Sequence, residues 1–333
     1  MQGTILGLLA ETHIHPGAGQ SEGAVDLPVA REKTTDYPFV PGSGVKGAMR
    51  DLAERRGFSA AVKEGDVVRM VEKACDAAVV KFDKNKAEKL AREIEEQEKK
   101  RDKPLTIEEK AQKAAWLATS GVYGEADAAG NLLLSDAKLL LLPVRCLSRC
   151  YLWLTCPHLI ERYQRDRQRV TGEAPKMFDG FGALATGDPP PILCAGTKGE
   201  KLFLEERLFA RRGDIPDGLV EFVSPLVGHE EAKKRLPEQL AVVTNDDFAW
   251  FARYALPVHA HNVLDENKTS KNLWYEETLA PDTLFYSVAL FRNGNAENHI
   301  ENLFFTNGGH PYLQLGGNET VGQGWFHVTR VRS

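Results

Sequence analysis

Residues 37–56 read Tyr37-Pro-Phe-Val-Pro41, Gly42-Ser-Gly-Val-Lys-Gly47 and Ala48-Met-Arg-Asp-Leu-Ala-Glu-Arg-Arg56, and this stretch decides how the chain begins to fold. Its two prolines hold the first five residues in an extended conformation. The residues from Ala48 onward favour a helix, with Ser43 as its N-cap and Gly57 at its end. The stretch therefore predicts an extended approach, a glycine-rich turn and the start of a helix.

The glycine spacing from Gly42 to Gly47 matches the G-x-G-x-x-G fingerprint of dinucleotide-binding proteins. That fingerprint needs a strand directly before it and a second strand after its helix. Here two prolines precede it and a charged helical segment follows. The stretch is not a Walker A loop either, because Lys46 precedes the last glycine and Ala48 stands in the place of a serine or threonine.

The physical basis of the fingerprint nevertheless applies to any phosphate. Glycines let backbone amides approach closely, and a helix N-terminus adds unpaired N–H donors and a partial positive charge. The candidates in this stretch for contacts to an RNA phosphodiester are Gly42, Ser43, Gly44, Lys46 and Arg50. A tight turn into a helix with a solvated lysine is the alternative interpretation.

A second glycine-rich segment, Leu315-Gly-Gly-Asn-Glu-Thr-Val-Gly-Gln-Gly-Trp325, precedes the last predicted strand. Segments of this kind mark places where the backbone runs close to another backbone or to a ligand. Amides and a hydroxyl suited to RNA phosphates are offered by Gly317, Asn318 and Thr320. Such contacts predict binding that depends on salt and is largely indifferent to base sequence.

The composition sets wider bounds. The 333 residues are enough for one large domain or two ordinary ones. Lysine and arginine total 42 against 47 acidic residues, so the net charge of −5 argues against a strongly basic domain but leaves room for a local basic groove. No apolar run approaches the ~20 residues that span a bilayer. Five cysteines without a Cys-x-x-Cys pair are typical of reduced thiols in a cytoplasmic protein.

Apolar runs predict strands over residues 3–12, 131–145, 150–155, 201–209, 256–263, 283–291 and 325–331. A basic helix is expected over residues 158–169. Residues 63–117 form a charged helical insertion, which is broken at Pro104 and restarted by a capping box from Thr106 to Glu109. Strands that alternate with helices and long insertions indicate an α+β fold with an antiparallel sheet.

Several segments together resemble the RAMP superfamily. They are an N-terminal strand, a histidine-containing loop with Gly19-Gln-Ser-Glu-Gly-x-x-Asp26, the stretch Pro38 to Arg50, and Gly316-Gly-Asn-Glu-Thr-Val-Gly-Gln-Gly-Trp325. Within that superfamily they are most similar to the fourth Cmr subunits, the repeated backbone proteins of type III-B CRISPR complexes. Shorter segments that fit are Ser135-Asp-Ala-Lys138, Leu142-Pro-Val-Arg145, Thr155-Cys-Pro157 and Leu273-Trp-Tyr-Glu-Glu277. The resemblance covers most of the chain.

The resemblance implies a single domain over residues 1–333, with an RRM-like (ferredoxin-like) palm, helical insertions and a protruding β-hairpin thumb expected at residues 256–275. It also implies that copies assemble head to tail in a helical filament on crRNA, together with other Cmr subunits. Each thumb is then expected to interrupt the guide–target duplex. Each copy is expected to act as an endoribonuclease that cleaves the target RNA with the help of Mg²⁺ or Mn²⁺.

The resemblance places the catalytic aspartate at Asp26. A carboxylate on a glycine-flanked loop can coordinate Mg²⁺ or orient a ribose 2′-OH for attack on the adjacent phosphate, which would leave a 2′,3′-cyclic phosphate and a 5′-OH. A solvated loop aspartate is the alternative. His13 and His15 share a face if the strand continues, and His15 is a candidate general acid or base.

Near the base of the expected thumb, Glu276 and Glu277 match an acidic pair of the family, with Tyr275 beside them. A second carboxylate there would complete a metal site or act on the leaving group, whereas solvation of a strand end is the plainer interpretation. Three functions remain open at this point: an RNA-guided endoribonuclease backbone, a structural subunit that only binds guide RNA, and a nucleotide- or cofactor-binding enzyme built around residues 42–47.

Overall fold

The computed structural model describes residues 2–21, 23–101, 103–185, 187–197, 200–306 and 310–331. Its backbone forms two compact units. The helical unit comprises residues 1–3, 45–134 and 289–313, and the sheet unit comprises residues 4–44, 135–288 and 314–333. Each unit joins segments that lie far apart in the chain.

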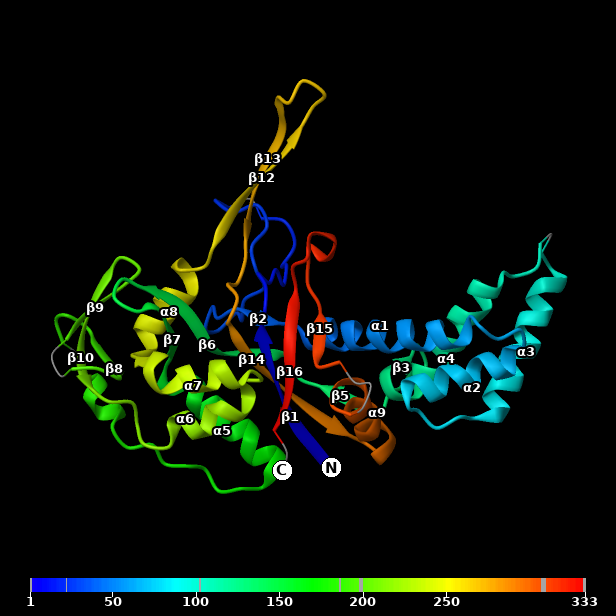
Figure 1. The fold of residues 1–333 in the computed structure, drawn as a ribbon, viewed down its shortest axis with the longest axis horizontal. Coiled ribbons are helices and arrows are strands. Elements are labelled where there is room, and N and C mark those ends of the chain that lie inside the picture. Colours follow the sequence, from blue (N-terminus) through cyan, green and yellow to red (C-terminus); the bar gives the residue numbers. More distant parts are fainter. Residues whose placement is uncertain are drawn as a thin grey trace. The chain divides into compact units, whose positions relative to one another are not determined.

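The sheet unit is organised around one large sheet in the order β16-β1-β14-β6-β7-β11-β8-β10-β9 (Figure 1). Its strands are β1 (Gln2–Ala10), β6 (Ala137–Cys146), β7 (Cys150–Thr155), β8 (Pro191–Cys194), β9 (Lys201–Leu204), β10 (Arg207–Gly213), β11 (Leu240–Val243), β14 (Leu284–Phe291) and β16 (Trp325–Val331). The first and last strands are antiparallel neighbours, with Ile5 opposite Val331 and Ala10 opposite Phe326. β1 is buried continuously from Thr4 to Ala10, as expected for a strand covered on both faces.

Most strand pairs with a defined register in this sheet are antiparallel, as predicted, but two are parallel. β11 runs parallel to β7, with Leu240 opposite Trp153, and β10 runs parallel to β8, with Ala210 opposite Pro191. The prediction of an antiparallel sheet is therefore wrong at these pairs. A parallel pair needs a long crossover, and the segments between the paired strands are long enough to supply it.

Helices of the sheet unit pack on this sheet through aromatic side chains. The ring of Tyr163 lies 5.0 Å from that of Tyr286 on β14 and 4.8 Å from that of Phe222. The predicted helix over residues 158–169 is confirmed as α5. The remaining elements of this unit are β2 (Phe39–Val40), α5 (Pro157–Thr171), η1 (Phe181–Leu184), α6 (Leu219–Val223), η2 (Ser224–Leu226), α7 (Glu230–Gln239), α8 (Asn245–Tyr254) and η3 (Glu319–Val321).

A separate two-stranded hairpin stands out from the sheet unit (Figure 1). It consists of β12 (Val258–Leu264) and β13 (Ser270–Glu277), with Val258 opposite Glu277 and His261 opposite Trp274. Because strand side chains alternate between faces, His259, His261, Trp274 and Glu276 share one face. The turn at its tip, residues 265–269, is polar and exposed, and on the strands Leu264 and Leu273 each expose about half of their surface (53% and 52%).

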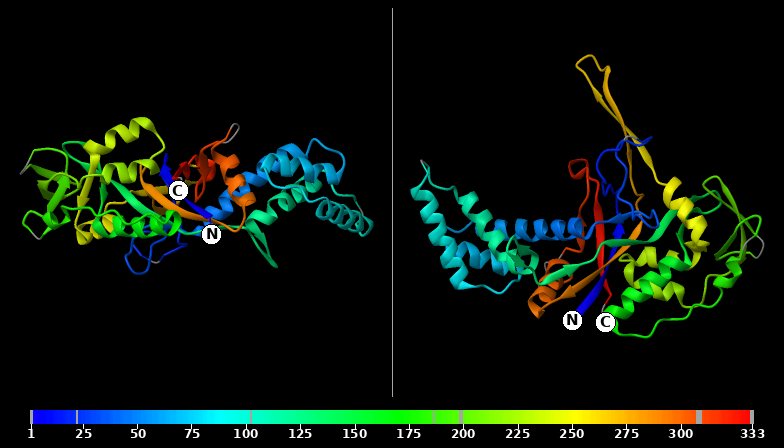
Figure 2. Two further views of the ribbon diagram at one scale, coloured as in Figure 1. Left: turned by 90° about the horizontal axis from the view of Figure 1, so that it is seen from below. Right: turned by 180° about the vertical axis from the view of Figure 1, so that it is seen from behind.

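The helical unit is built from helices and short strand segments. It contains most of α1 (Gly42–Ala61), all of α2 (Val67–Ala78), α3 (Lys84–Lys99), α4 (Ile107–Tyr123) and α9 (Gly294–Phe304), the strands β3 (Gly124–Glu125), β4 (Ala128–Ala129) and β5 (Leu132–Leu134), and the start of β15 (Tyr312–Gln314). Helices α2, α3 and α4 lie side by side in both views of Figure 2, in cyan and blue-green. The charged segment 63–117 thus contributes α2, α3 and the first part of α4.

Two local predictions for the helical unit have opposite outcomes. The capping box is confirmed: the amide of Glu109 donates to the hydroxyl of Thr106, and the amide of Thr106 donates to the carboxylate of Glu109.

The predicted helix end at Gly57 is wrong, because α1 continues to Ala61. A Cβ at Gly57 would lie 3.3 Å from the Cβ of Ala115 and 3.4 Å from that of Ala74. Gly57 therefore allows close helix packing and does not end the helix.

His299 of α9 is buried inside the helical unit with both ring nitrogens satisfied. Its Nδ1–H donates to the carbonyl of Ala78 at 2.6 Å, and its Nε2 accepts from the hydroxyl of Tyr123 at 3.0 Å. Only the second contact requires the neutral imidazole, because a protonated Nε2 cannot accept a hydrogen bond. Burial accordingly lowers the pKa of His299 to about 4. No helix of the described residues is long and apolar enough to cross a membrane.

We predict that acid destabilises the protein through His299. The unfolded chain binds a proton there below about pH 6.5, whereas the folded chain does so only below about pH 4. Stability is therefore expected to fall, by on the order of 3 kcal/mol, as the pH is lowered through this window. Urea unfolding at several pH values measures the loss. His299→Gln keeps a donor and an acceptor without titrating, so equal pH slopes for both proteins would refute the prediction.

Candidate active site at the root of the hairpin

The loop that follows β1 pairs with the edge of β13 through backbone hydrogen bonds. The amide of Leu27 donates to the carbonyl of Tyr275 at 3.1 Å, and the amide of Glu277 donates to the carbonyl of Leu27 at 3.0 Å. Ile14 and Leu279 exchange two further backbone hydrogen bonds. This pairing brings the two predicted site segments of the loop, residues 13–15 and 26, to the root of the hairpin.

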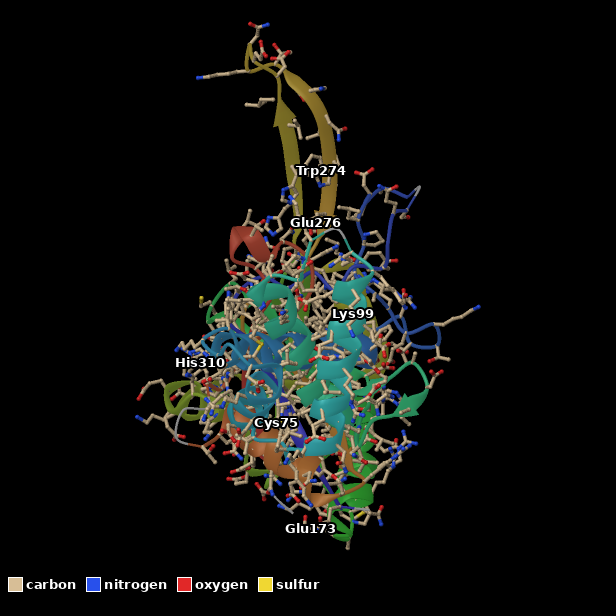
Figure 3. The ribbon with its side chains drawn as sticks, turned by 90° about the vertical axis from the view of Figure 1, so that its right-hand side faces the viewer. Cys75, Lys99, Glu173, Trp274, Glu276 and His310 are labelled. Carbon is tan, nitrogen blue, oxygen red and sulfur yellow. The ribbon has the colours of Figure 1, made fainter. Side chains whose placement is uncertain are left out.

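Glu276 is the central carboxylate of this site. Figure 3 shows it at the root of the hairpin, with Trp274 nearer the tip. Its exposed fraction is only 3%, and both of its oxygens have partners within the protein. Oε1 accepts from the side-chain amide of Asn318 at 2.7 Å and lies 3.3 Å from Nδ1 of His15, and Oε2 lies 2.9 Å from Nε2 of His261. Three segments distant in sequence therefore meet on one buried carboxylate.

His15 is held in a defined tautomer. Its Nδ1 lies 2.8 Å from the backbone carbonyl of Glu277, and since a carbonyl can only accept, Nδ1 carries the proton. Nε2 is therefore unprotonated in the neutral ring and can take a proton from a substrate. This geometry supports the prediction of His15 as an acid or base, which remains a prediction.

Glycines from two loops make room for His15. A Cβ at Gly17 would lie 2.8 Å from Nε2 of His15, and a Cβ at Gly317 would lie 3.0 Å from its Cδ2. The amide of Gly317 also donates to the carbonyl of His15 at 2.9 Å. The late glycine-rich segment is thus close to another backbone and a side chain.

Two of the donors predicted for RNA contacts in the late segment are already used within the protein. The amide of Gly317 is used on His15, and the side-chain amide of Asn318 is used on Glu276 and Gln323. Neither donor is available to a phosphate in this arrangement. Thr320 lies exposed in η3 and is the one of the three predicted contacts that stays accessible.

Asp26 lies exposed beside the root of the hairpin. Its Oδ2 accepts from the amide of Tyr275 at 2.8 Å, which fixes the carboxylate against the edge of β13. Within the described residues, Oδ1 has no hydrogen-bond partner and faces solvent or a substrate. Asp26 is thus both positioned and accessible, as a group acting on RNA must be.

The structure has no preassembled metal site at Asp26 among the described residues. Among the described residues, no group of three or more His, Cys, Asp or Glu side chains has the geometry to hold a metal ion. Asp26 offers one carboxylate oxygen, and the oxygens of Glu276 are taken up by protein partners. The predicted metal requirement therefore remains a prediction, and no step below depends on it.

Glu277 and Tyr275 differ from their predicted catalytic roles. Glu277 is buried, with Oε1 2.6 Å from Nη2 of Arg31 and Oε2 accepting from the amide of Val29 at 3.1 Å. Because both oxygens are used to tie the loop to the hairpin, its role is structural. The side chain of Tyr275 points to the face opposite Glu276 and is 43% exposed, so only its backbone contributes at Asp26.

The site contains two further imidazoles that sequence reasoning missed. His259 packs edge-on against His13, with ring centroids 4.8 Å apart, and His261 faces Glu276. Burial, and then the neighbouring His259, lower the pKa of His13. The spacing of two residues between His259 and His261 indicates that they share one face of a strand. Only the folded structure shows that this face lies against Glu276 and His13.

The predicted phosphate site at the start of α1 is partly occupied by an acidic side chain. The amide of Gly42 donates to Oδ1 of Asp136 at 2.7 Å, and a Cβ at Gly42 would lie 2.9 Å from the carbonyl of Ser135. Gly42 is therefore neither free nor accessible, which corrects its predicted role. Ser43 is not the N-cap, because α1 already begins at Gly42. Ser43 and Gly44 are exposed.

Lys46 and Arg50 lie on α1 within the helical unit. Arg50 is held by the protein: its Nε donates to Glu54 at 2.6 Å, and its guanidinium lies 5.3 Å from the centre of the Trp116 ring. Arg50 is thus not free to follow an RNA chain. Lys46 has no acidic partner among the described residues, and its pKa is lowered by burial and by the nearby Arg292 and Arg50. Lys46 and Arg292 form a locally positive surface.

Comparisons with known proteins agree with this architecture. The family model of the RAMP superfamily matches residues 8–327. The CRISPR system Cmr endoribonuclease Cmr4 of Pyrococcus furiosus is 29% identical over 344 residues, which cover 99% of this chain and 96% of the relative. The mixed α and β fold also matches solved structures. Oligomeric Cmr4 from Pyrococcus furiosus aligns with a TM-score of 0.59 at 22% identity, covering 100% of both chains. The type III-B Cmr-beta bound to cognate target RNA aligns with a TM-score of 0.61 at 18% identity, covering 99% of this chain and 97% of the other.

We predict that Glu277 is needed for folding of the hairpin root. Glu277→Ala removes the carboxylate partner of Nη2 of Arg31 and of the amide of Val29, which is expected to cost about 2–4 kcal/mol of unfolding free energy. Urea unfolding measures the loss, and amide hydrogen exchange should show faster exchange around residues 27–29. Exposed Glu266 at the hairpin tip provides the control, as Glu266→Ala. Unchanged stability for Glu277→Ala would return Glu277 to the catalytic candidates.

Proposed function

Because the chain belongs to the RAMP superfamily, we propose that it is a backbone subunit of a type III-B CRISPR complex that binds crRNA and cleaves the paired target RNA. Its likeness to the Cmr endoribonuclease Cmr4 supports the proposal. The single observation that carries it is the convergence of Asp26, His15 and Glu276 from three segments on the root of one exposed hairpin. The partners in the proposal are crRNA, target RNA, further copies of the chain and other Cmr subunits, as with the oligomeric and RNA-bound relatives.

The strand order supports a ferredoxin-like palm. Four strands lie in the order β16-β1-β14-β6, which are the fourth, first, third and second of the set along the chain. Helix α1 follows the first of them, and α9 separates the third from the fourth. This is the β-α-β-β-α-β succession of the ferredoxin-like fold. We assign these four strands to the palm and the hairpin β12–β13 to the thumb, whose exposed Leu264 and Leu273 are suited to contact the bases of a guide–target duplex.

The chemistry that suits these residues is attack by a ribose 2′-OH on the adjacent phosphate. The 2′ oxygen forms a bond to phosphorus while the bond to the 5′ oxygen breaks, leaving a 2′,3′-cyclic phosphate and a 5′-OH. Nε2 of His15 takes the 2′-OH proton, and Oδ1 of Asp26 orients the hydroxyl. The 5′ oxygen leaves with a proton from solvent or from a protonated imidazole. General acid–base assistance of this kind contributes about 10²–10⁴-fold.

The two rival functions have less support. A dinucleotide-binding enzyme needs a free helix N-terminus for the pyrophosphate, but Asp136 already caps Gly42. The helix α1 is also followed by α2 and not by a second strand. A purely structural guide-binding subunit would have the same fold, yet it would have no use for an accessible aspartate beside a buried His–Glu pair.

We predict that Asp26→Ala abolishes target cleavage in the reconstituted complex, by at least about 10²-fold, while guide binding and assembly persist. Single-turnover cleavage of labelled target RNA measures the rate. Asp217→Ala, at an exposed aspartate of another loop, is the matched control. A target with deoxyribose at the cut position should resist the wild-type complex. Cleavage by Asp26→Ala at the wild-type rate would refute the catalytic assignment, and a wild-type complex that binds but never cuts would favour the structural role.

We also predict that Lys46 and Arg292 contact guide phosphates. Changing either residue to Gln is expected to weaken guide RNA binding equally for all guide sequences and to reduce the salt slope by about one. Binding measured over a series of KCl concentrations gives both quantities. Lys73→Gln on α2, where Lys73 pairs with Asp76, serves as the control of equal charge. Unchanged slopes for both variants would place the guide elsewhere.

A further inference from the structure

His261 on β12 contacts the proposed active site through Glu276. Its ring stacks on that of Trp274, with centroids 5.4 Å apart and planes 14° from parallel. The stacking fixes the plane of the imidazole and points Nε2 at the carboxylate, 2.9 Å from Oε2. That nitrogen is buried and makes no hydrogen bond of good geometry, so its contact with Glu276 is electrostatic and not a directed hydrogen bond.

Glu276 divides its two oxygens between two sides of the site. Oε1 faces His15 and Asn318, and Oε2 faces His261. A buried carboxylate is costly unless each oxygen has a partner. Without His261, Oε2 has no partner among the described residues. The carboxylate would then gain by turning toward solvent, which would draw Oε1 away from His15.

The other charged groups around the root are engaged elsewhere. Arg31 is paired with Glu277, and Asp26 is held by the amide of Tyr275. His259 lies opposite Glu276 in the strand register, but its ring packs against His13. Within the described part of the chain, His261 is therefore the group that holds Oε2.

We propose that His261 is a positioning residue for RNA cleavage: it holds Oε2 of Glu276, which keeps Oε1 against Nδ1 of His15 and so orients the imidazole whose Nε2 exchanges a proton with the RNA. The inference rests on the proposed endoribonuclease function and adds a residue to it. It also ties catalysis to the hairpin, because His261 and Trp274 belong to the hairpin, whereas His15 belongs to the loop after β1.

The test uses the assembled, guide-loaded complex and single-turnover cleavage of saturating target RNA. His261→Ala is expected to lower the cleavage rate about 10–100-fold without changing the Kd for target RNA, because a misoriented catalytic group slows chemistry and leaves binding intact. His261→Gln places a polar side-chain amide where the imidazole faces Oε2 and is expected to stay within about threefold of wild type. Asn262→Ala, on the opposite face of the same strand, controls for damage to the hairpin and should cut normally.

Several outcomes would overturn the inference. One is cleavage by His261→Ala at the rate of Asn262→Ala. Another is an equal loss in the Ala and Gln variants together with weaker target binding and a lower Tm, which would show a structural role only. A wild-type complex that binds target RNA without cutting it would instead overturn the proposed function, and the inference with it. If the wild-type complex cuts target RNA and His261→Ala cuts it equally fast, only the inference about His261 fails. If the wild-type complex does not cut at all, the proposed function fails.

Discussion

Two consecutive buried carboxylates, Glu276 and Glu277, are the constraint on which the hairpin root depends. Neighbouring strand residues point to opposite faces, so the two carboxylates need separate sets of partners. Glu277 takes Arg31 and a backbone amide of the loop after β1. Glu276 takes His15, His261 and Asn318. Because an unpaired buried charge costs several kcal/mol, this requirement joins the loop, the hairpin and the late glycine-rich segment at one point.

The glycines have a different role from the one their pattern suggests. Gly17 and Gly317 leave space for the ring of His15, and Gly57 leaves space between helices. A glycine indicates that something approaches the backbone closely, but it does not indicate whether that is a phosphate, a side chain or another helix. At the late segment the pattern predicted a close approach to another backbone or to a ligand, and the structure shows the backbone and side chain of His15 there.

At the start of α1, the sequence likewise predicted the kind of partner but not its identity. A glycine-rich turn before a helix is suited to an anion, and this prediction is physically sound. The anion found at Gly42 is Asp136, which lies 94 residues further along the chain. The positive surface lies instead at Lys46 and Arg292, which a net charge of −5 does not reveal.

Taken by itself, the sequence determined the mixed α and β class, the capping box at Thr106 and the helix after Pro157, and it selected the segments around residues 15, 26 and 276 as candidates for the site. These depend on local propensity, on strand alternation and on motif resemblance, all of which are readable along the chain. The tertiary structure alone decided that β7 and β11 are parallel, that Glu277 is structural, and that His259 and His261 belong to the site. Each of these depends on which distant segment lies opposite a given face, and the burial and charge of that partner decide whether a side chain is used for folding or left accessible to RNA.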